Sequence, residues 1–139
     1  MDQLAEFAGN HVLLVLGLLG SFALAVGYEL RLKASGLTQV SAGEAVKLIN
    51  RSAIVLDIRS PEAYRSGHIV NAKNISLAEL QADPDQLNKK KNKLLLTVCE
   101  TGAQAGKAAN LLRRAGFENT FSLRGGIRGW QSESLPLVK

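Results

Sequence analysis

The fold is decided by residues 54–69, which read IVLDIRSPEAYRSGHI. The short apolar run at residues 54–56 has the composition of a strand that is buried in a parallel sheet. A helix is predicted to begin at Ser60-Pro61-Glu62, because proline suits the first turn of a helix, and to end at Gly67. This stretch therefore indicates a strand that is followed directly by a helix.

The same alternation continues on both sides of this stretch. Residues 41–44 (SAGE) form a capping box for a helix that runs to Arg51. Residues 94–98 (LLLTV) predict a second buried strand, helical apolar spacing then continues to Gly116, and residues 121–123 predict a further strand. Strands and helices that alternate in this way predict an α/β fold, a parallel sheet with helices on both faces, with ligands bound beyond the carboxyl ends of the strands.

Cys99 is the only cysteine of the chain, and it follows the strand predicted over residues 94–98. The backbone N–H groups of the next turn and the positive end of the next helix would stabilise a thiolate on its sulfur. The alternative is a free cysteine that packs as a small hydrophobic residue. From these residues alone, both interpretations stay open.

Three blocks resemble the signature segments of the rhodanese (sulfurtransferase) family: residues 55–69, residues 72–75 (AKNI) and residues 123–130 (LRGGIRGW). Cys99 lies between them, where that family keeps its catalytic cysteine. The resemblance implies a rhodanese-like domain over residues 38–139, with Cys99 as the catalytic residue. The substrate-binding residues that it implies are Glu100, Thr101, Gly102, Ala103 and Gln104.

Other residues of these blocks are expected to hold the fold rather than to react. They are Asp57, Arg59, Glu62, His68, Gly125, Gly126 and Trp130. The first three are interpreted as an ion-pair and hydrogen-bond set, because a bidentate pair of an arginine and a carboxylate fixes a loop well. The histidine is interpreted as a hydrogen-bonded structural residue, the glycines as a tight turn and the tryptophan as part of the core.

The loop after the cysteine departs from the family pattern. Active members usually read C-x-x-G-x-R, often with another cation after the cysteine, whereas residues 99–104 read CETGAQ. Glu100 places a negative charge beside the sulfur, and Gln104 lacks the positive charge that would stabilise a thiolate and an incoming thiosulfate. A phosphatase is disfavoured, because no arginine closes the loop around a phosphate.

Two functions of different classes stay open. In the first, the domain takes sulfane sulfur from a donor, carries it as a persulfide on Cys99 and gives it to a thiol acceptor, without a cofactor. In the second, the domain has little catalytic activity and binds a membrane protein partner. The cysteine and Gly102 favour the first function, and the missing cations favour the second.

Residues 8–30 predict a transmembrane helix. No Asp, Glu, Lys or Arg lies between Ala8 and Tyr28, and this stretch is long enough to cross a bilayer. A cleaved signal peptide is the alternative, but it would have a positively charged start. The residues ahead of the apolar stretch instead include Asp2 and Glu6 and contain no Lys or Arg.

The flanks of this helix predict its orientation. Arg31 and Lys33 follow the apolar stretch closely and no cationic side chain precedes it, so the positive-inside rule places the N-terminus outside. We therefore expect a single-pass protein of the cell inner membrane, with residues 31–37 as a linker and the C-terminal domain in the cytoplasm. A reducing compartment agrees with a single unpaired cysteine.

The chain is basic, with 17 Lys and Arg against 12 Asp and Glu. Part of the excess lies in residues 89–93 (KKKNK), which predict either a solvated loop or a contact with anionic lipid headgroups. Nucleic acid is not an expected partner, because no basic helix with interleaved aromatic residues is present. One cysteine and two histidines form no cluster of metal ligands, so no metal is expected.

Overall fold

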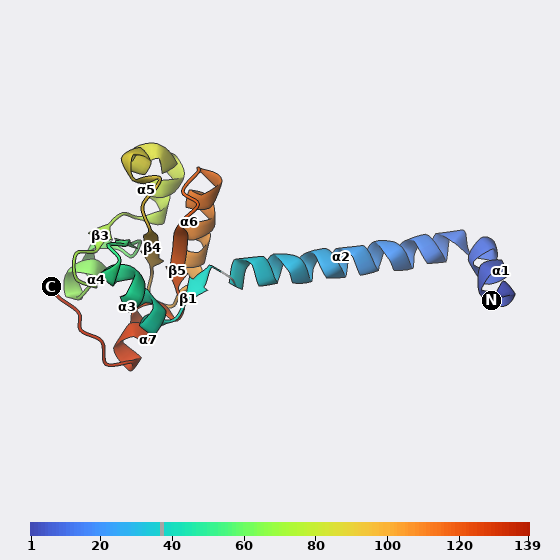
Figure 1. Cartoon of the computed structure of the whole chain (residues 1–139), viewed down its shortest axis with the longest axis horizontal. Helices are drawn as coiled ribbons and strands as arrows, with labels where there is room; N and C mark the ends of the chain where they lie inside the picture. Colours follow the sequence, from blue (N-terminus) through green and yellow to red (C-terminus); the bar gives the residue numbers. More distant parts are fainter. Residues whose placement is uncertain (37) are drawn as a thin grey trace. The chain divides into compact units, whose positions relative to one another are not determined.

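The structure is a computed structural model that describes residues 1–36 and 38–139, without the side chains of residues 32–36. The chain divides into two units, Met1–Gly36 and Leu37–Lys139. Figure 1 shows the first unit as helices alone and the second as a sheet with helices around it.

The first unit contains α1 (Asp2–Asn10) and α2 (Val12–Gly36). The apolar helix therefore begins at Val12 and not at residue 8 as predicted. The chain leaves the helical conformation at His11, which has φ −127° and ψ 45°. Gly9 and Asn10 precede this break, and both have low helix propensity, which gives the break a local cause.

Residues Val12–Arg31 of α2 form the one stretch of the described chain that is long and apolar enough to cross a membrane. Its 20 residues correspond to about 30 Å of helix, which matches the hydrocarbon thickness of a bilayer. The helix then continues through most of the predicted linker and ends at Gly36. Leu37, the last residue of that linker, lies outside the described residues.

The second unit is built on a five-stranded sheet with the strand order β1-β5-β4-β2-β3, in which all neighbours are parallel. The strands are β1 (Gln39–Val40), β2 (Ile54–Asp57), β3 (Lys73–Asn74), β4 (Leu95–Val98) and β5 (Thr120–Leu123). The three central strands are those that the apolar runs predicted. The edge strands β1 and β3 were not predicted.

Helices follow the strands, as the alternation of the sequence predicted. They are α3 (Ala42–Asn50), α4 (Pro61–Ser66), α5 (Leu77–Ala82), the 3₁₀ helix η1 (Pro84–Lys90), α6 (Ala103–Arg114) and α7 (Gly126–Ser132). The predicted capping box is present at the start of α3. The Ser41 N–H donates to the Glu44 carboxylate at 2.8 Å, and the Glu44 N–H donates to the Ser41 hydroxyl at 3.3 Å. The N–H and the hydroxyl of Ser41 both donate to the Glu44 carboxylate, and these two hydrogen bonds lower the pKa of Glu44.

Apolar side chains cover both faces of the sheet. Because successive strand residues point to opposite faces, β4 places Leu96 in one cluster and Leu95 in the other. The first cluster includes Trp130 of α7, and the second includes Leu112 of α6. The predicted α/β fold, a parallel sheet with helices on both faces, is confirmed.

We predict that a fragment of residues 35–139 folds without α1 and α2, because its own strands and helices supply both apolar clusters. Thermal unfolding should be cooperative. Replacing the fully buried Leu96 (Leu96→Ala) should lower the free energy of unfolding by about 2–5 kcal/mol. An aggregated or molten fragment would contradict the prediction and would mean that the first unit is needed for folding.

Candidate functional site

Cys99 lies at the carboxyl edge of the sheet, directly after β4. The neighbouring strand β2 ends at the same level, because Val98 of β4 is paired with Asp57. The side chain of Cys99 belongs to the apolar cluster beneath α6, and the residue is only 4% exposed. The cysteine therefore occupies the position at which open parallel sheets bind ligands.

Two backbone N–H groups point at the sulfur. The N–H of Gly102 donates to Cys99 Sγ at 3.0 Å, and the N–H of Ala105 donates to it at 3.3 Å. Gly102 is the N-cap of α6 and has φ 100°, a left-handed conformation that suits glycine. The two N–H groups at the N-terminus of α6 are therefore placed to hydrogen-bond a negative charge on the sulfur.

The Gly125-Gly126 turn and α7 hold the loop from the other side. The N–H of Ile127 donates to the carbonyl of Cys99 at 2.9 Å, and the N–H of Arg128 donates to that of Glu100 at 3.2 Å. Gly126 has φ 60°, and a Cβ atom there would lie 2.6 Å from the carbonyl oxygen of Glu100. The two glycines therefore form the expected turn and also allow a close backbone contact that sequence reasoning missed.

Arg59 is fixed by a bidentate ion pair with Asp57. Its Nε and Nη2 atoms donate to the two carboxylate oxygens at 3.0 and 2.7 Å, and Nη2 also donates to the carbonyl of Gly67 at 2.7 Å. Burial alone would lower the pKa of Arg59, but the hydrogen bonds and charge of Asp57 and the charge of Glu100 raise it above its usual value. The arginine therefore stays charged inside the domain.

Glu62 was predicted to join this set, and the structure places it elsewhere. It lies in the first turn of α4 and is exposed, where its charge favours the positive end of the helix. The remaining guanidinium nitrogen of Arg59, Nη1, instead lies 3.5 Å from Oε2 of Glu100. Arg59 thus has two carboxylate partners, Asp57 and Glu100, and the second comes from the loop that follows Cys99.

Glu100 has a second cationic partner. Its Oε1 atom lies 3.5 Å from Nε of Arg128 on α7. From the sequence, only Gln104 was considered as a source of positive charge near Glu100, whereas two arginines of other segments contact its carboxylate. No local pattern could have revealed these contacts, because the loop after β2 brings Arg59 and α7 brings Arg128 from other parts of the chain.

The other predicted site residues have simpler environments. Thr101, Ala103 and Gln104 are exposed along the loop and the first turn of α6. The Nδ1 atom of His68 lies 2.9 Å from the carbonyl oxygen of Tyr64, which accepts the hydrogen bond, and the ring of His68 stacks on that of Tyr64. Trp130 is 4% exposed, and its Nε1 donates to the carbonyl of Pro136 at 3.0 Å.

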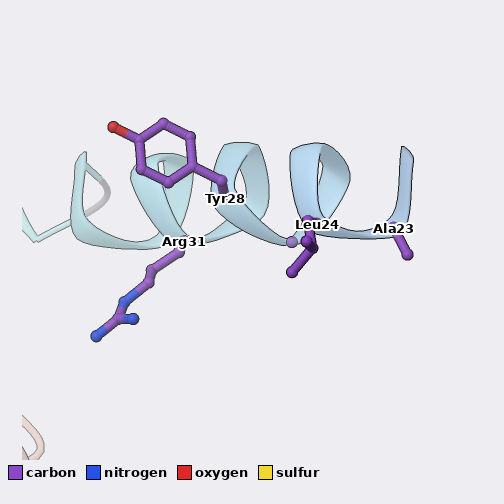
Figure 2. A pocket seen from close by; sticks show the side chains of 5 residues that line it. Ala23, Leu24, Tyr28 and Arg31 are labelled. Atoms are coloured by element: carbon purple, nitrogen blue, oxygen red, sulfur yellow. The ribbon is translucent and has the colours of Figure 1, made fainter. Parts of the chain in front are cut away.

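Other features of the described chain offer no second reactive centre. The basic residues 89–93 begin within η1. Lys91, which follows the end of η1, has its Nζ atom 3.8 Å from Oδ1 of Asp85 and over the ring of Phe117. Figure 2 shows a hollow lined by side chains of α2, from Ala23 to Arg31. Because a single helix forms this hollow, it is a surface groove. Among the described residues, no group of three or more His, Cys, Asp or Glu could hold a metal ion.

Comparison with known proteins places this site in context. Residues 41–133 match the family model for the rhodanese-like domain. The chain is 33% identical over 141 residues to the uncharacterized protein YibN of Escherichia coli K12, and the match covers 100% of this chain and 99% of that protein. It is 34% identical over 95 residues to the thiosulfate sulfurtransferase GlpE of Coxiella burnetii, which covers 68% of this chain and 87% of that protein.

Solved structures show the same fold. A rhodanese-related protein from Thermoplasma volcanium superposes with a TM-score of 0.66 at 29% sequence identity. The superposition covers 72% of this chain and 96% of that one. The similarity therefore lies in the α/β unit that carries Cys99.

We predict that Gly126→Ala destabilises the protein, because the new Cβ atom would meet the backbone of Glu100 and the positive φ is unfavourable for alanine. The free energy of unfolding should fall by at least about 1–2 kcal/mol. Gly43→Ala is the matched control, since Gly43 lies within α3 with open space around it, and alanine there should be neutral or stabilising. Equal effects of the two substitutions on thermal unfolding would contradict the prediction.

Proposed function

We propose that this chain, which belongs to the rhodanese-like domain family, is a membrane-anchored sulfurtransferase that carries sulfane sulfur as a persulfide on Cys99. The observation that carries the proposal is the pair of N–H groups, from Gly102 and Ala105, that point at Cys99 Sγ. The similarity to GlpE of Coxiella burnetii, whose name states a thiosulfate sulfurtransferase activity, supports the same class of chemistry.

The first step loads the cysteine. The Cys99 thiolate attacks the sulfane sulfur of a donor, a new bond forms between Sγ and that sulfur, and the bond between the sulfane sulfur and the rest of the donor breaks. The electron pair of the broken bond leaves with the donor remnant, which is sulfite when the donor is thiosulfate. The outer sulfur then carries the negative charge that the thiolate had before.

The second step unloads the cysteine. A thiolate or another nucleophile attacks the outer sulfur, and the Cys99 thiolate leaves with the electron pair of the persulfide bond. The N–H groups of Gly102 and Ala105 are already in place to receive the returning negative charge. The two steps use no metal or cofactor. Their substrates are a sulfane-sulfur donor and a thiol acceptor.

The apolar stretch of α2 supports the membrane anchor. None of the residues of Val12–Arg31 is buried within the chain, although the stretch is strongly apolar. A core helix of a soluble protein would be covered by its own domain, so a lipid environment is the natural cover for this one. The cationic flank at Arg31 favours a cytoplasmic C-terminal domain, and a bacterial inner membrane with the N-terminus outside is the location we propose.

A second function competes with this one, namely a membrane-tethered module that binds a protein partner and has little catalytic activity. The observation that favours it is the exposed loop itself. Residues 100–104 carry one carboxylate and no cation, and Thr101, Ala103 and Gln104 are exposed and available for contact. The state of Cys99 after treatment with a sulfur donor distinguishes the two functions.

We predict that the folded protein gains one sulfur atom when it is treated with inorganic polysulfide, because the loop N–H groups stabilise a persulfide on Cys99. Intact-mass spectrometry should show this gain for the wild type, its absence in Cys99→Ser, and its removal by an added thiol. Protein unfolded in urea is the control for the loop, and its persulfide should be lost faster. If the folded wild type holds no sulfur from any donor, the interaction module is the better function.

We predict that the C-terminus lies in the cytoplasm. Alkaline phosphatase fused after Lys139 should be inactive in cells, because it folds only outside the reducing cytoplasm, whereas a fluorescent protein at the same place should fluoresce. The same two reporters fused at the other end of α2 should give the opposite results. An active phosphatase after Lys139 would overturn both the orientation and the reducing environment of Cys99.

A further inference from the structure

We propose that Arg128 determines the specificity for anionic sulfur donors. In the structure Arg128 forms an ion pair with the Glu100 carboxylate, and an anionic donor takes the place of this carboxylate when it binds. The inference rests on the proposed sulfur transfer at Cys99 and deepens it. It assigns a donor-binding role to a residue of α7, outside the loop that the family pattern describes.

The ion pair lies directly beside the reacting sulfur in the chain. Glu100 follows Cys99, and its two carboxylate oxygens contact different arginines, Oε2 with Arg59 and Oε1 with Arg128, both at 3.5 Å. Charge-assisted hydrogen bonds between an arginine and a carboxylate are shorter, about 2.7–2.9 Å. Both contacts of Glu100 are therefore looser than the 2.7 Å pair of Arg59 with Asp57.

The two arginines differ in their freedom to change partner. The side chain of Arg59 is 6% exposed and is held by Asp57 and the carbonyl of Gly67. The side chain of Arg128 is 71% exposed, and Glu100 is its ion-pair partner. An exposed pair is weak, so the Arg128 guanidinium can leave the Glu100 carboxylate, whereas Arg59 stays in place.

The backbone of Arg128 keeps this guanidinium near the loop when its partner changes. Its N–H donates to the carbonyl of Glu100 at 3.2 Å, and the N–H of Ile127 donates to that of Cys99 at 2.9 Å. These two hydrogen bonds attach the start of α7 to Cys99 and Glu100, next to which the donor must bind. Arg128 can thus supply the positive charge that Gln104 does not provide.

Glu100 decides how much of this charge a donor meets. While the Glu100 carboxylate is paired with Arg128, it neutralises the charge of that arginine. An approaching dianion such as thiosulfate is then attracted little by Arg128, and the carboxylate beside the sulfur repels it. A neutral donor does not need the arginine. Removing the charge of Glu100 should therefore favour anionic reagents over neutral ones, and this gain should depend on Arg128.

Alkylation of the single cysteine tests this without any sulfur transfer. The full chain in detergent is treated with iodoacetate, an anion, or with iodoacetamide, its neutral analogue, and the rate at Cys99 is followed by mass spectrometry. The ratio of the two rates cancels changes in the intrinsic reactivity of the thiol. At low salt, Glu100→Gln should raise this ratio about fivefold, and high salt should reduce the gain.

Double variants identify the cation. Glu100→Gln combined with Arg128→Gln should return the ratio to about the wild-type value. Glu100→Gln combined with Arg124→Gln is the matched control. Arg124 is an exposed arginine after β5, whereas the ion pairs of Glu100 are with Arg59 and Arg128, and the net charge of the two double variants is equal. This control should keep most of the gain. Equal ratios in the two double variants, or no gain in Glu100→Gln, would overturn the proposal.

Loading of Cys99 with sulfur separates this proposal from the proposed function. Glu100→Gln should reach half-maximal loading at a several-fold lower concentration of thiosulfate, with a smaller change for a neutral organic trisulfide. Failure of the wild type to load from any donor would overturn sulfur transfer, while the alkylation ratios would still report on Arg128. Equal changes for thiosulfate and the trisulfide would overturn the role of Arg128 in donor choice.

Discussion

The close backbone contact between Gly126 and the cysteine loop is the constraint on which the site depends. Gly126 lies so near the carbonyls of Cys99 and Glu100 that no Cβ atom fits between them. This approach lets the first N–H groups of α7 satisfy the two loop carbonyls. With its carbonyls held on that side, the loop can turn its own N–H groups, those of Gly102 and Ala105, toward the sulfur.

Charge around the loop follows from the same contact. The start of α7 carries Arg128 to the carboxylate of Glu100, and the loop between β2 and α4 carries Arg59 to it from the other side. The buried Asp57–Arg59 pair fixes one of these cations, because a buried charge that lost its partner would be costly. A loop that looks acidic in sequence is therefore embedded among basic residues in three dimensions.

The sequence predicted well what local chemistry determines. The apolar runs that became β2, β4 and β5, the capping box at Ser41 and the helix after Cys99 each depend on neighbouring residues. The edge strands β1 and β3 have two residues each and are too short for any periodicity to show. The partners of Glu100 depend on how distant elements pack, so the sequence could not determine them. Glu62 instead lies in the first turn of α4, a helix whose start the sequence did predict. The cysteine itself was predictable because it stands where a buried strand ends.

The departures from the family pattern now have a physical interpretation. A cation inside the loop would act on every anion that reaches the sulfur, whereas a cation on α7 acts through a carboxylate that competes with the incoming anion. Such an arrangement weakens the response to small dianions and leaves neutral or protein-bound persulfides less affected. At the membrane location that we propose, anionic lipid headgroups would attract the basic residues of the domain, and the paired Glu100 would still keep small anions from the sulfur. The acidic residue beside Cys99 is thus compatible with sulfur transfer from neutral or protein-bound persulfides, whose binding does not depend on a negative charge.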